Sequence, residues 1–126
     1  FHIGPDHKVR ANTTERLAAE QRGGIYDGNY FCNPANGYGL QMSRALGDCH
    51  MGAIISNEPE VYTIDDPQWI LLASDGLTDP GHRTSGQLLD EIKEFGRKNA
   101  TANELMKWAE SRSLEDNATS LVWSAS

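Results

Sequence analysis

Residues 69–77 of the chain read Trp69-Ile70-Leu71-Leu72-Ala73-Ser74-Asp75-Gly76-Leu77. The apolar run at 69–73 has the length and composition of a buried β-strand. The run stops at Asp75-Gly76, where the glycine allows a sharp turn and the strand carries the aspartate out of the core on a stiff support. Such a strand end would present a metal ligand, although an isolated Asp-Gly after a strand more often only opens a turn.

A second acidic turn, Glu115-Asp116-Asn117, stands immediately before another apolar run at 118–123. Aspartates at the ends of two strands would meet at one edge of a sheet even when they are far apart in the sequence. Carboxylates that converge in this way form an all-oxygen site, which suits Mg²⁺ or Mn²⁺ rather than zinc. Asp75 and Asp116 are therefore candidate metal ligands, and the alternative is that both are turn residues.

Three helices are predicted from local patterns. Residues 12–15 are typical of a helix start, and the strong helix formers at 15–22 predict a helix that ends at Gly23-Gly24. Apolar residues at helical spacing predict a second helix from residue 84 or 85 to about 96. Thr101 and Glu104 form a capping box that opens a third helix. Helices segregated to one face of a sheet are the architecture that this order of elements favours.

The remaining segments predict loops and strands. Residues 25–39 predict a long loop or a distorted hairpin, which either packs through its aromatic side chains or faces a substrate as a flap. A short strand is expected at 39–42, one helical turn at 43–48, and two strands separated by a bend within 54–64. The turn at 65–67 predicts an antiparallel hairpin that joins the second of these strands to 69–73.

Composition narrows the class of protein. The chain has 126 residues, of which 38% are hydrophobic, so it forms one domain at most or a piece of one. Its net charge of −7 argues against nucleic acid or an anionic membrane as the main partner. Cys32 and Cys49 are too few for a disulfide scaffold and lack zinc-site spacing. We interpret both cysteines as reduced thiols and therefore expect a cytoplasmic location. No apolar run is long enough to span a membrane, and the first residues show no signal-peptide pattern.

Four motifs resemble, in order and approximate spacing, the C-terminal half of the metal-dependent serine/threonine phosphatases, the protein phosphatase 2C (PPM) family. They are Ser43-Arg44-Ala45-Leu46-Gly47-Asp48, Ile55-Ser56-Asn57-Glu58-Pro59-Glu60-Val61, Leu72-Ala73-Ser74-Asp75-Gly76-Leu77 and Asp116-Asn117-Ala118-Thr119. The opening Asp6-His7-Lys8 resembles the start of the family's Asp-His-Lys segment, and Glu15 with Gly23-Gly24 fits the family pattern C-terminal to that segment.

The resemblance implies an α+β fold, the C-terminal part of a four-layer α-β-β-α sandwich with mostly antiparallel strands. It implies hydrolysis of phosphoserine or phosphothreonine in proteins by metal-activated water, with no nucleophilic side chain. Asp75 and Asp116 match the aspartates that ligate one ion of the family's binuclear Mn²⁺ or Mg²⁺ centre, and Asp79 matches a further acidic position nearby. Arg44 matches a structural position, and 25–38 matches the flap beside the active site.

The family's phosphate-binding arginine, its Glu-Asp pair and its Asp-Gly-His-Gly segment have no match in the chain. Gly4 replaces a usual threonine, and Ala18-Ala19 replace a usual Arg-Ile pair. Residues 1–126 are therefore expected to be a partial domain that lacks its N-terminal half, binds metal weakly and does not turn over alone. Pairing with that half or with another chain is expected. The alternative is an inactive, truncated module that binds a protein partner.

Overall fold

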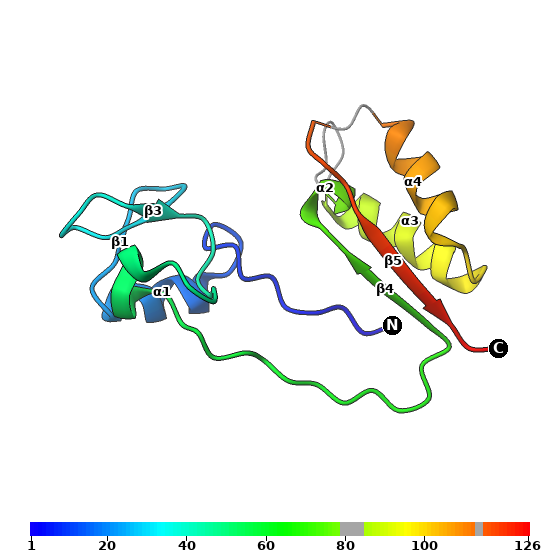
Figure 1. Cartoon of the computed structure of the whole chain (residues 1–126), viewed down its shortest axis with the longest axis horizontal. Coiled ribbons are helices and arrows are strands. Elements are labelled where there is room, and N and C mark those ends of the chain that lie inside the picture. The colour runs from blue at the N-terminus through cyan, green and yellow to red at the C-terminus, as the bar shows by residue number, and fades with distance from the viewer. Residues whose placement is uncertain (79–84, 113–114) are drawn as a thin grey trace. The chain divides into compact units, whose positions relative to one another are not determined.

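The computed structural model describes residues 1–78, 85–112 and 115–126 (Figure 1). The chain folds as two units: one is His2–Tyr62, and the other is Thr63–Ser126 together with Phe1. Both units combine helices with antiparallel strands, as expected. Within the described ranges, no helix is both long and apolar enough to cross a lipid bilayer.

In the first unit, helix α1 (Thr13–Gln21) begins where the sequence predicts. The side chain of Asn12 caps it, because its Oδ1 accepts a hydrogen bond from the Glu15 amide at 3.1 Å. The buried face of α1 packs through Ala19 into a small apolar core. The other buried members of this core are Val9, Phe31, Met51, Ile54 and Ile55.

Residues 25–40 form a small antiparallel sheet, so the distorted-hairpin interpretation is the correct one. Its strands are β1 (Ile25–Tyr26), β2 (Phe31–Cys32) and β3 (Gly39–Leu40), in that spatial order. The turn before β2 is built on the Asp27 carboxylate, which accepts hydrogen bonds from the amides of Asn29 and Tyr30. These backbone donors hold the pKa of Asp27 below its usual value.

The helical turn expected at 43–48 is wrong. Ser43 is buried at a bend and donates its hydroxyl hydrogen to Glu15 Oε2 at 2.6 Å, so it caps no helix. Arg44 instead forms an isolated parallel bridge with Ser56. Two short 3₁₀ turns, separated by Gly52 at φ +56°, occupy Cys49–Ile54 (η1), a segment whose end was expected to begin a strand. Tertiary hydrogen bonds therefore override the local turn signals here.

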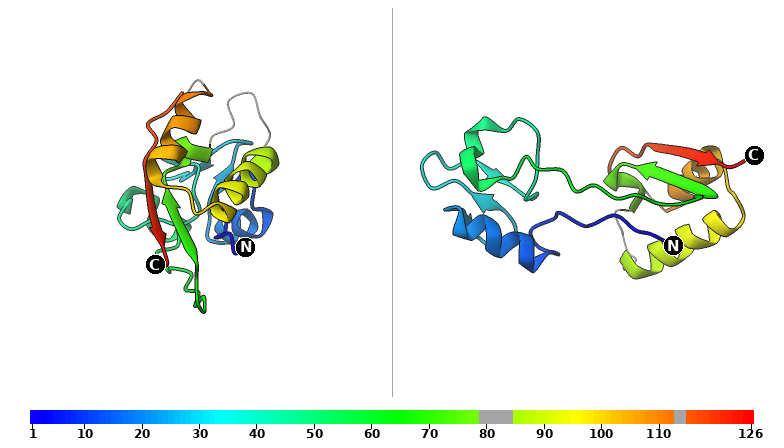
Figure 2. Two further views of the ribbon diagram at one scale, coloured as in Figure 1. Left: turned by 90° about the vertical axis from the view of Figure 1, so that its right-hand side faces the viewer. Right: turned by 90° about the horizontal axis from the view of Figure 1, so that it is seen from below.

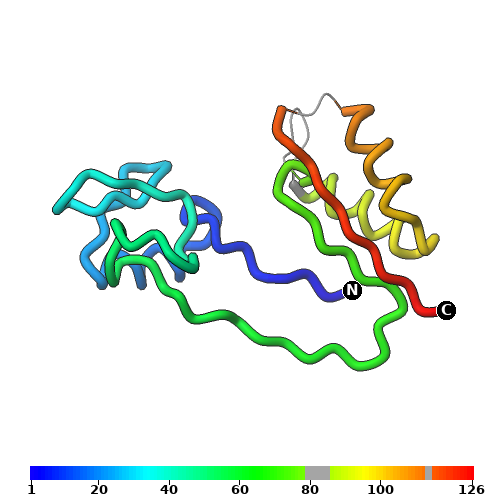
Figure 3. The backbone as a smooth tube through the Cα atoms, in the orientation of Figure 1, coloured from blue at the N-terminus to red at the C-terminus, as the bar shows by residue number. Residues whose placement is uncertain are grey.

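The second unit is built on an antiparallel pair, β4 (Trp69–Ala73) and β5 (Ser120–Ser124), which run side by side in Figure 3. The register pairs Trp69 with Ser124 at one end and Ala73 with Ser120 at the other. The hairpin expected between 61–64 and 69–73 is wrong, since 61–64 has no regular structure. The segment just before residue 61 is held instead by Arg44, which binds the Glu58 carbonyl and the Glu60 carboxylate.

The described residues of this unit also form the helices α2 (Asp75–Thr78), α3 (Ser85–Arg97) and α4 (Ala102–Glu110). The capping box at Thr101 is confirmed. Helix α2 stands where a polar loop was expected to begin. The N-cap of α3, expected at Thr84 or Ser85, lies outside the described residues and side chains.

Helices α3 and α4 lie on one face of the β4–β5 pair (Figure 2). On that face Leu71 pairs with Val122, and both pack against the buried residues Leu77, Leu105 and Ala109. The opposite face carries Ile70, Leu72, Leu121 and Trp123, which are 38–64% exposed. The expectation that β4 is a buried strand is therefore wrong for this outer face, because the described helices cover only the inner one.

Candidate functional site

The two acidic turns singled out in the sequence lie at the same end of the β4–β5 pair. Because the strands are antiparallel and Ala73 pairs with Ser120, the end of β4 adjoins the start of β5. Asp75 is the first residue of α2, directly beyond β4, and Asp116 precedes β5. Both residues are exposed. The structure thus brings together the two positions that the sequence singled out as metal ligands.

Ser74 joins the two turns through three hydrogen bonds. Its backbone amide donates to the Thr119 carbonyl at 3.0 Å. Its hydroxyl oxygen accepts from the Thr119 amide at 2.9 Å, and the hydroxyl donates to the Asn117 carbonyl at 3.3 Å. The strand register is thereby continued past Ala73 into the segment that carries Asp116.

Gly76 brings the same two turns into backbone contact. A Cβ atom on Gly76 would lie 2.2 Å from the carbonyl oxygen of Asn117, which is closer than any real contact. Only glycine allows this approach. Since Gly76 follows Asp75 and Asn117 follows Asp116, this backbone contact brings together the two turns that carry the aspartates.

The chemistry of these donors fits a divalent cation. Carboxylate oxygens are the ligands that Mg²⁺ and Mn²⁺ prefer, and two of them supply part of an octahedral set. One oxygen of Asp116 accepts a hydrogen bond from the Asn117 amide at 2.7 Å, which orients that carboxylate. Asp79, the third expected ligand, lies outside the described residues. Metal binding at this site stays a prediction.

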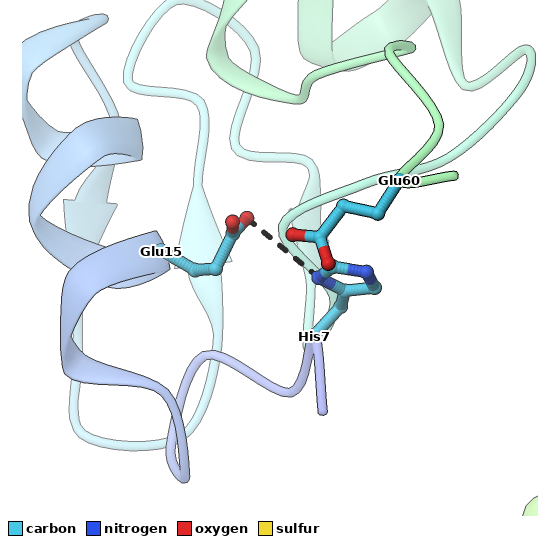
Figure 4. A group of neighbouring side chains, drawn as sticks. All are labelled: His7, Glu15 and Glu60. Carbon is cyan, nitrogen blue, oxygen red and sulfur yellow. Dashed lines mark ion pairs between the residues drawn. The ribbon is translucent and has the colours of Figure 1, made fainter. Parts of the chain in front are cut away.

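A second cluster of potential ligands, which the sequence analysis did not anticipate, lies in the first unit. Ligand atoms of His7, Glu15 and Glu60 all lie within 4.8 Å of one another, the one such group among the described residues (Figure 4). His7 Nδ1 is 3.8 Å from Glu15 Oε2. Glu60 lies far from His7 and Glu15 in the sequence, so no local spacing pattern predicts the group.

Arg44 already forms ion pairs with both carboxylates of this cluster. Its Nη2 lies 2.6 Å from Glu15 Oε1 and 2.9 Å from Glu60 Oε1, and its Nε donates to Glu15 Oε2 at 3.1 Å. The hydrogen bonds from Arg44, assisted by the Ser43 hydroxyl, lower the pKa of Glu15 to about 2. A guanidinium held by two carboxylates is an ion-pair network, so the cluster has a structural role, as the sequence suggested for Arg44.

The segment expected to form a flap folds onto η1. Tyr38 stacks on His50 with ring centroids 4.3 Å apart. The side chains of Asn33 and Asn36 both donate to the His50 carbonyl oxygen, at 2.7 and 2.8 Å. These contacts hold the segment against η1. Its role as a flap beside a substrate stays a prediction.

Comparison with known proteins identifies the family. The family model described as Protein phosphatase 2C matches residues 5–118. Probable protein phosphatase 2C 58 of Arabidopsis thaliana is 32% identical over 95% of this chain and 42% of its own length. Two rice relatives, probable protein phosphatases 2C 62 and 2C 52, are 30% and 33% identical over 86% and 95% of this chain.

The chain spans 38% and 24%, respectively, of the lengths of those two rice relatives, and so well under half of each relative named here. No solved structure matches it significantly. The family match nevertheless covers nearly the whole chain, including the Asp75-Gly76 and Asp116-Asn117 turns. The chain therefore belongs to the protein phosphatase 2C family.

Proposed function

We propose that the chain is part of a phosphoserine/phosphothreonine protein phosphatase, in which Asp75 and Asp116 hold a Mn²⁺ or Mg²⁺ ion. The observation that carries this proposal is the contact between Gly76 and the Asn117 carbonyl, which brings together the two turns that carry these aspartates. Family membership supports the reaction. When bound, such ions supply an activated water for direct attack on the phosphoryl group.

Each residue of the site has a distinct part in this proposal. Asp75 and Asp116 offer charged oxygen ligands, and Ser74 and Gly76 hold the two ligand-bearing turns in register. Asp79 is proposed as a further acidic ligand near the centre, and no nucleophilic side chain is assigned. The segment at 25–38 is proposed as the flap that lies beside the substrate.

The chain is further proposed to be the C-terminal part of a four-layer α-β-β-α sandwich domain. The exposed outer face of β4 and β5 supports this, because a second sheet would cover those apolar side chains. The remaining metal ligands and the phosphate-binding groups would come from the rest of the domain, or from a chain that replaces it. A phosphoprotein substrate and a cytoplasmic location complete the proposal.

Calorimetric titration with Mn²⁺ tests the site. The chain is compared with the double variant Asp75→Asn/Asp116→Asn and with a control, Asp65→Asn/Asp66→Asn, which removes the same charge from an exposed turn in the same unit. Binding that is lost in the first variant and kept in the control supports the metal site. Equal binding by all three makes the two aspartates turn residues and favours an inactive module that binds a protein partner.

Hydrolysis of p-nitrophenyl phosphate in the same buffer tests the partial active site. The proposal expects no metal-dependent turnover by the chain alone, because the two aspartates supply only part of the ligands that a divalent ion needs. If the chain alone shows turnover that disappears in the double variant, the proposed metal site is supported. The proposal that the rest of the domain is required for activity is then overturned.

A further inference from the structure

Helix α2 is too short to hold its own position. It has four residues, Asp75–Thr78, and a helix of one turn fixes many dihedral angles for very few hydrogen bonds. Among the described residues, the Leu77 amide donates to the Ser74 carbonyl at 3.1 Å, and the Thr78 hydroxyl donates to the Asp75 carbonyl at 3.2 Å. The carbonyl of Leu77 lies in the final turn, where helix carbonyls lack a partner within the helix.

Arg112 supplies the partner of that carbonyl. Its Nη2 donates to the Leu77 carbonyl oxygen at 2.6 Å, and Leu77 itself is fully buried. A hydrogen bond from a guanidinium is charge-assisted and therefore stronger than one between neutral groups. It reaches the chain two residues beyond Asp75, so it acts directly on the turn that carries this aspartate.

The Arg112 guanidinium is itself held by stacking on a side chain of α4 that contacts α3. It lies over the ring of Trp108 at 4.0 Å, and the Trp108 indole donates to Glu91 Oε2 of α3 at 2.6 Å. Phe95 of α3 packs edge-on against the same ring at 5.4 Å. A planar guanidinium stacked on a fixed aromatic ring loses little freedom when it donates.

Arg112 also leads toward the second acidic turn. It follows α4 directly, with its amide donating to the Ala109 carbonyl at 3.0 Å, and the chain then runs on to Asp116. The end of α4, the start of β5 and α2 lie at the same end of the unit (Figure 1). Its backbone is thus tied to the end of α4, while its side chain is tied to the turn that carries Asp75.

We infer that Arg112 is a positioning residue, which fixes the Asp75 turn relative to Asp116 through its hydrogen bond to the Leu77 carbonyl and its stacking on Trp108. This inference rests on the proposed role of the two aspartates as metal ligands. Through its contacts with the Leu77 carbonyl and the Trp108 ring, Arg112 acts on the metal by way of the geometry of the ligands.

The direction of the change in Mn²⁺ affinity distinguishes this positioning role of Arg112 from a purely electrostatic one. Removing a cation near a divalent metal site reduces repulsion and should tighten metal binding. Loss of a group that orients the ligands should instead weaken binding, by about tenfold. Arg112→Ala is therefore expected to weaken Mn²⁺ binding, against the electrostatic trend. Lys107→Ala, which removes a positive charge from the exposed side of α4, is the matched control and should bind as the wild type does or more tightly.

The experiment combines Mn²⁺ titration with amide hydrogen exchange on the 126-residue chain, in the wild type, Arg112→Ala, Arg112→Lys and Lys107→Ala. In Arg112→Ala the Leu77 amide should exchange at least about tenfold faster without metal, while the amides between β4 and β5 keep their protection. Arg112→Lys keeps a donor but loses the planar stack, so it should fall between Arg112→Ala and the wild type in both measurements.

Unchanged exchange at Leu77 in Arg112→Ala, or an equal rise in the β4–β5 amides, would overturn the inference, because the side chain would then have no local effect. Faster exchange at Leu77 with unweakened Mn²⁺ binding would also overturn it. The aspartate double variant keeps the two proposals distinct. If wild-type binding does not depend on Asp75 and Asp116, the proposed function fails, and Leu77 exchange still reports separately on whether Arg112 holds the turn.

Discussion

Arg44 shows how one side chain can organise a segment that has little regular structure. It joins α1, through Glu15, to the segment that carries Glu58 and Glu60. The Glu15 side chain is only 14% exposed, so its carboxylate is shielded from solvent and depends on Arg44 and Ser43. Removing one partner of such an ion pair strongly destabilises the folded protein, because the other charge stays buried without a partner.

This network makes stability depend on pH. The folded pKa of Glu15 is about 2, against an ordinary value of 4.5, so its contribution is complete above about pH 4.5 and is lost as the pH falls toward 2. Glu15→Gln should lower the free energy of unfolding at pH 7 by about 2–3 kcal/mol. It should also flatten the acid limb of the stability profile.

Urea unfolding of the wild type, Glu15→Gln and Glu20→Gln at pH 7 and pH 3 measures this effect. Glu20 is exposed on the same helix, and its variant should follow the wild-type profile. If Glu15→Gln and the wild type lose the same free energy between the two pH values, the Glu15 carboxylate is not the source of the dependence.

Gly76 is the residue on which the contact between the two acidic turns depends. Gly76→Ala should lower the free energy of unfolding by about 1–3 kcal/mol, because the new Cβ would meet the Asn117 carbonyl at 2.2 Å and the backbone would have to shift. Gly86→Ala in α3 is the control, since its Cβ would meet nothing within 4 Å. That variant should be neutral or more stable by up to about 1 kcal/mol. Thermal unfolding distinguishes the two, and equal effects would contradict the close approach.

At the scale of elements, the helices are specified by local chemistry. Helix α4 begins at a complete capping box, in which Glu104 Oε2 accepts from the Thr101 amide at 2.7 Å and the Thr101 hydroxyl oxygen accepts from the Glu104 amide at 3.4 Å. The bond from the Thr101 amide lowers the pKa of Glu104. The cap also sets the start of the helix that leads to Trp108 and Arg112.

Loss of this cap should have a measurable effect on stability. Thr101→Ala should lower the free energy of unfolding by about 1 kcal/mol, because the Glu104 amide loses its side-chain acceptor. Asn103→Ala, inside the same first turn and exposed, should cause no loss, since alanine is the better helix former. Denaturant midpoints of the two variants measure the difference. A smaller loss for Thr101→Ala than for Asn103→Ala would show that the capping box contributes nothing.

At the scale of the whole molecule, the outer face of β4 and β5 exposes several large apolar side chains. Ile70 pairs with Trp123 and Leu72 with Leu121, so these four apolar side chains form one continuous patch. Such a patch on a strand pair favours association with further protein. The inner face of the same strands carries the Leu71–Val122 pair and packs against the described helices.

Charged substitutions should therefore act differently on the two faces. Leu72→Lys/Leu121→Glu places opposite charges on a directly paired position of the outer face and should change the unfolding temperature by less than about 5 °C. It should also reduce binding of a hydrophobic dye and self-association. Leu71→Lys, the inner-face counterpart, should unfold the second unit. Light scattering, dye fluorescence and circular dichroism provide the measurements, and unfolding by the outer-face variant would show that this face is packed.

Local sequence determined much of this protein. Asn12, the Thr101–Glu104 box and the helical spacing of apolar residues predict α1, α3 and α4, because caps and periodicity act within one or two turns. The apolar runs ending at Ala73 and beginning at Ala118 predict β4 and β5, and the acidic turns beside them identify Asp75 and Asp116. The four motifs were enough to predict the family.

Only the tertiary structure decided which strand pairs with β4, how Ser43 and Arg44 are bound, and which side chain supports α2. The sequence predicted a hairpin before Trp69 and a helical turn after Met42, and both are absent. Glu15 lies 29 residues from Arg44, and Leu77 lies 35 residues from Arg112. Contacts of this kind form only when separate elements pack together, so no local spacing encodes them, and their free energy is large enough to override the local preference.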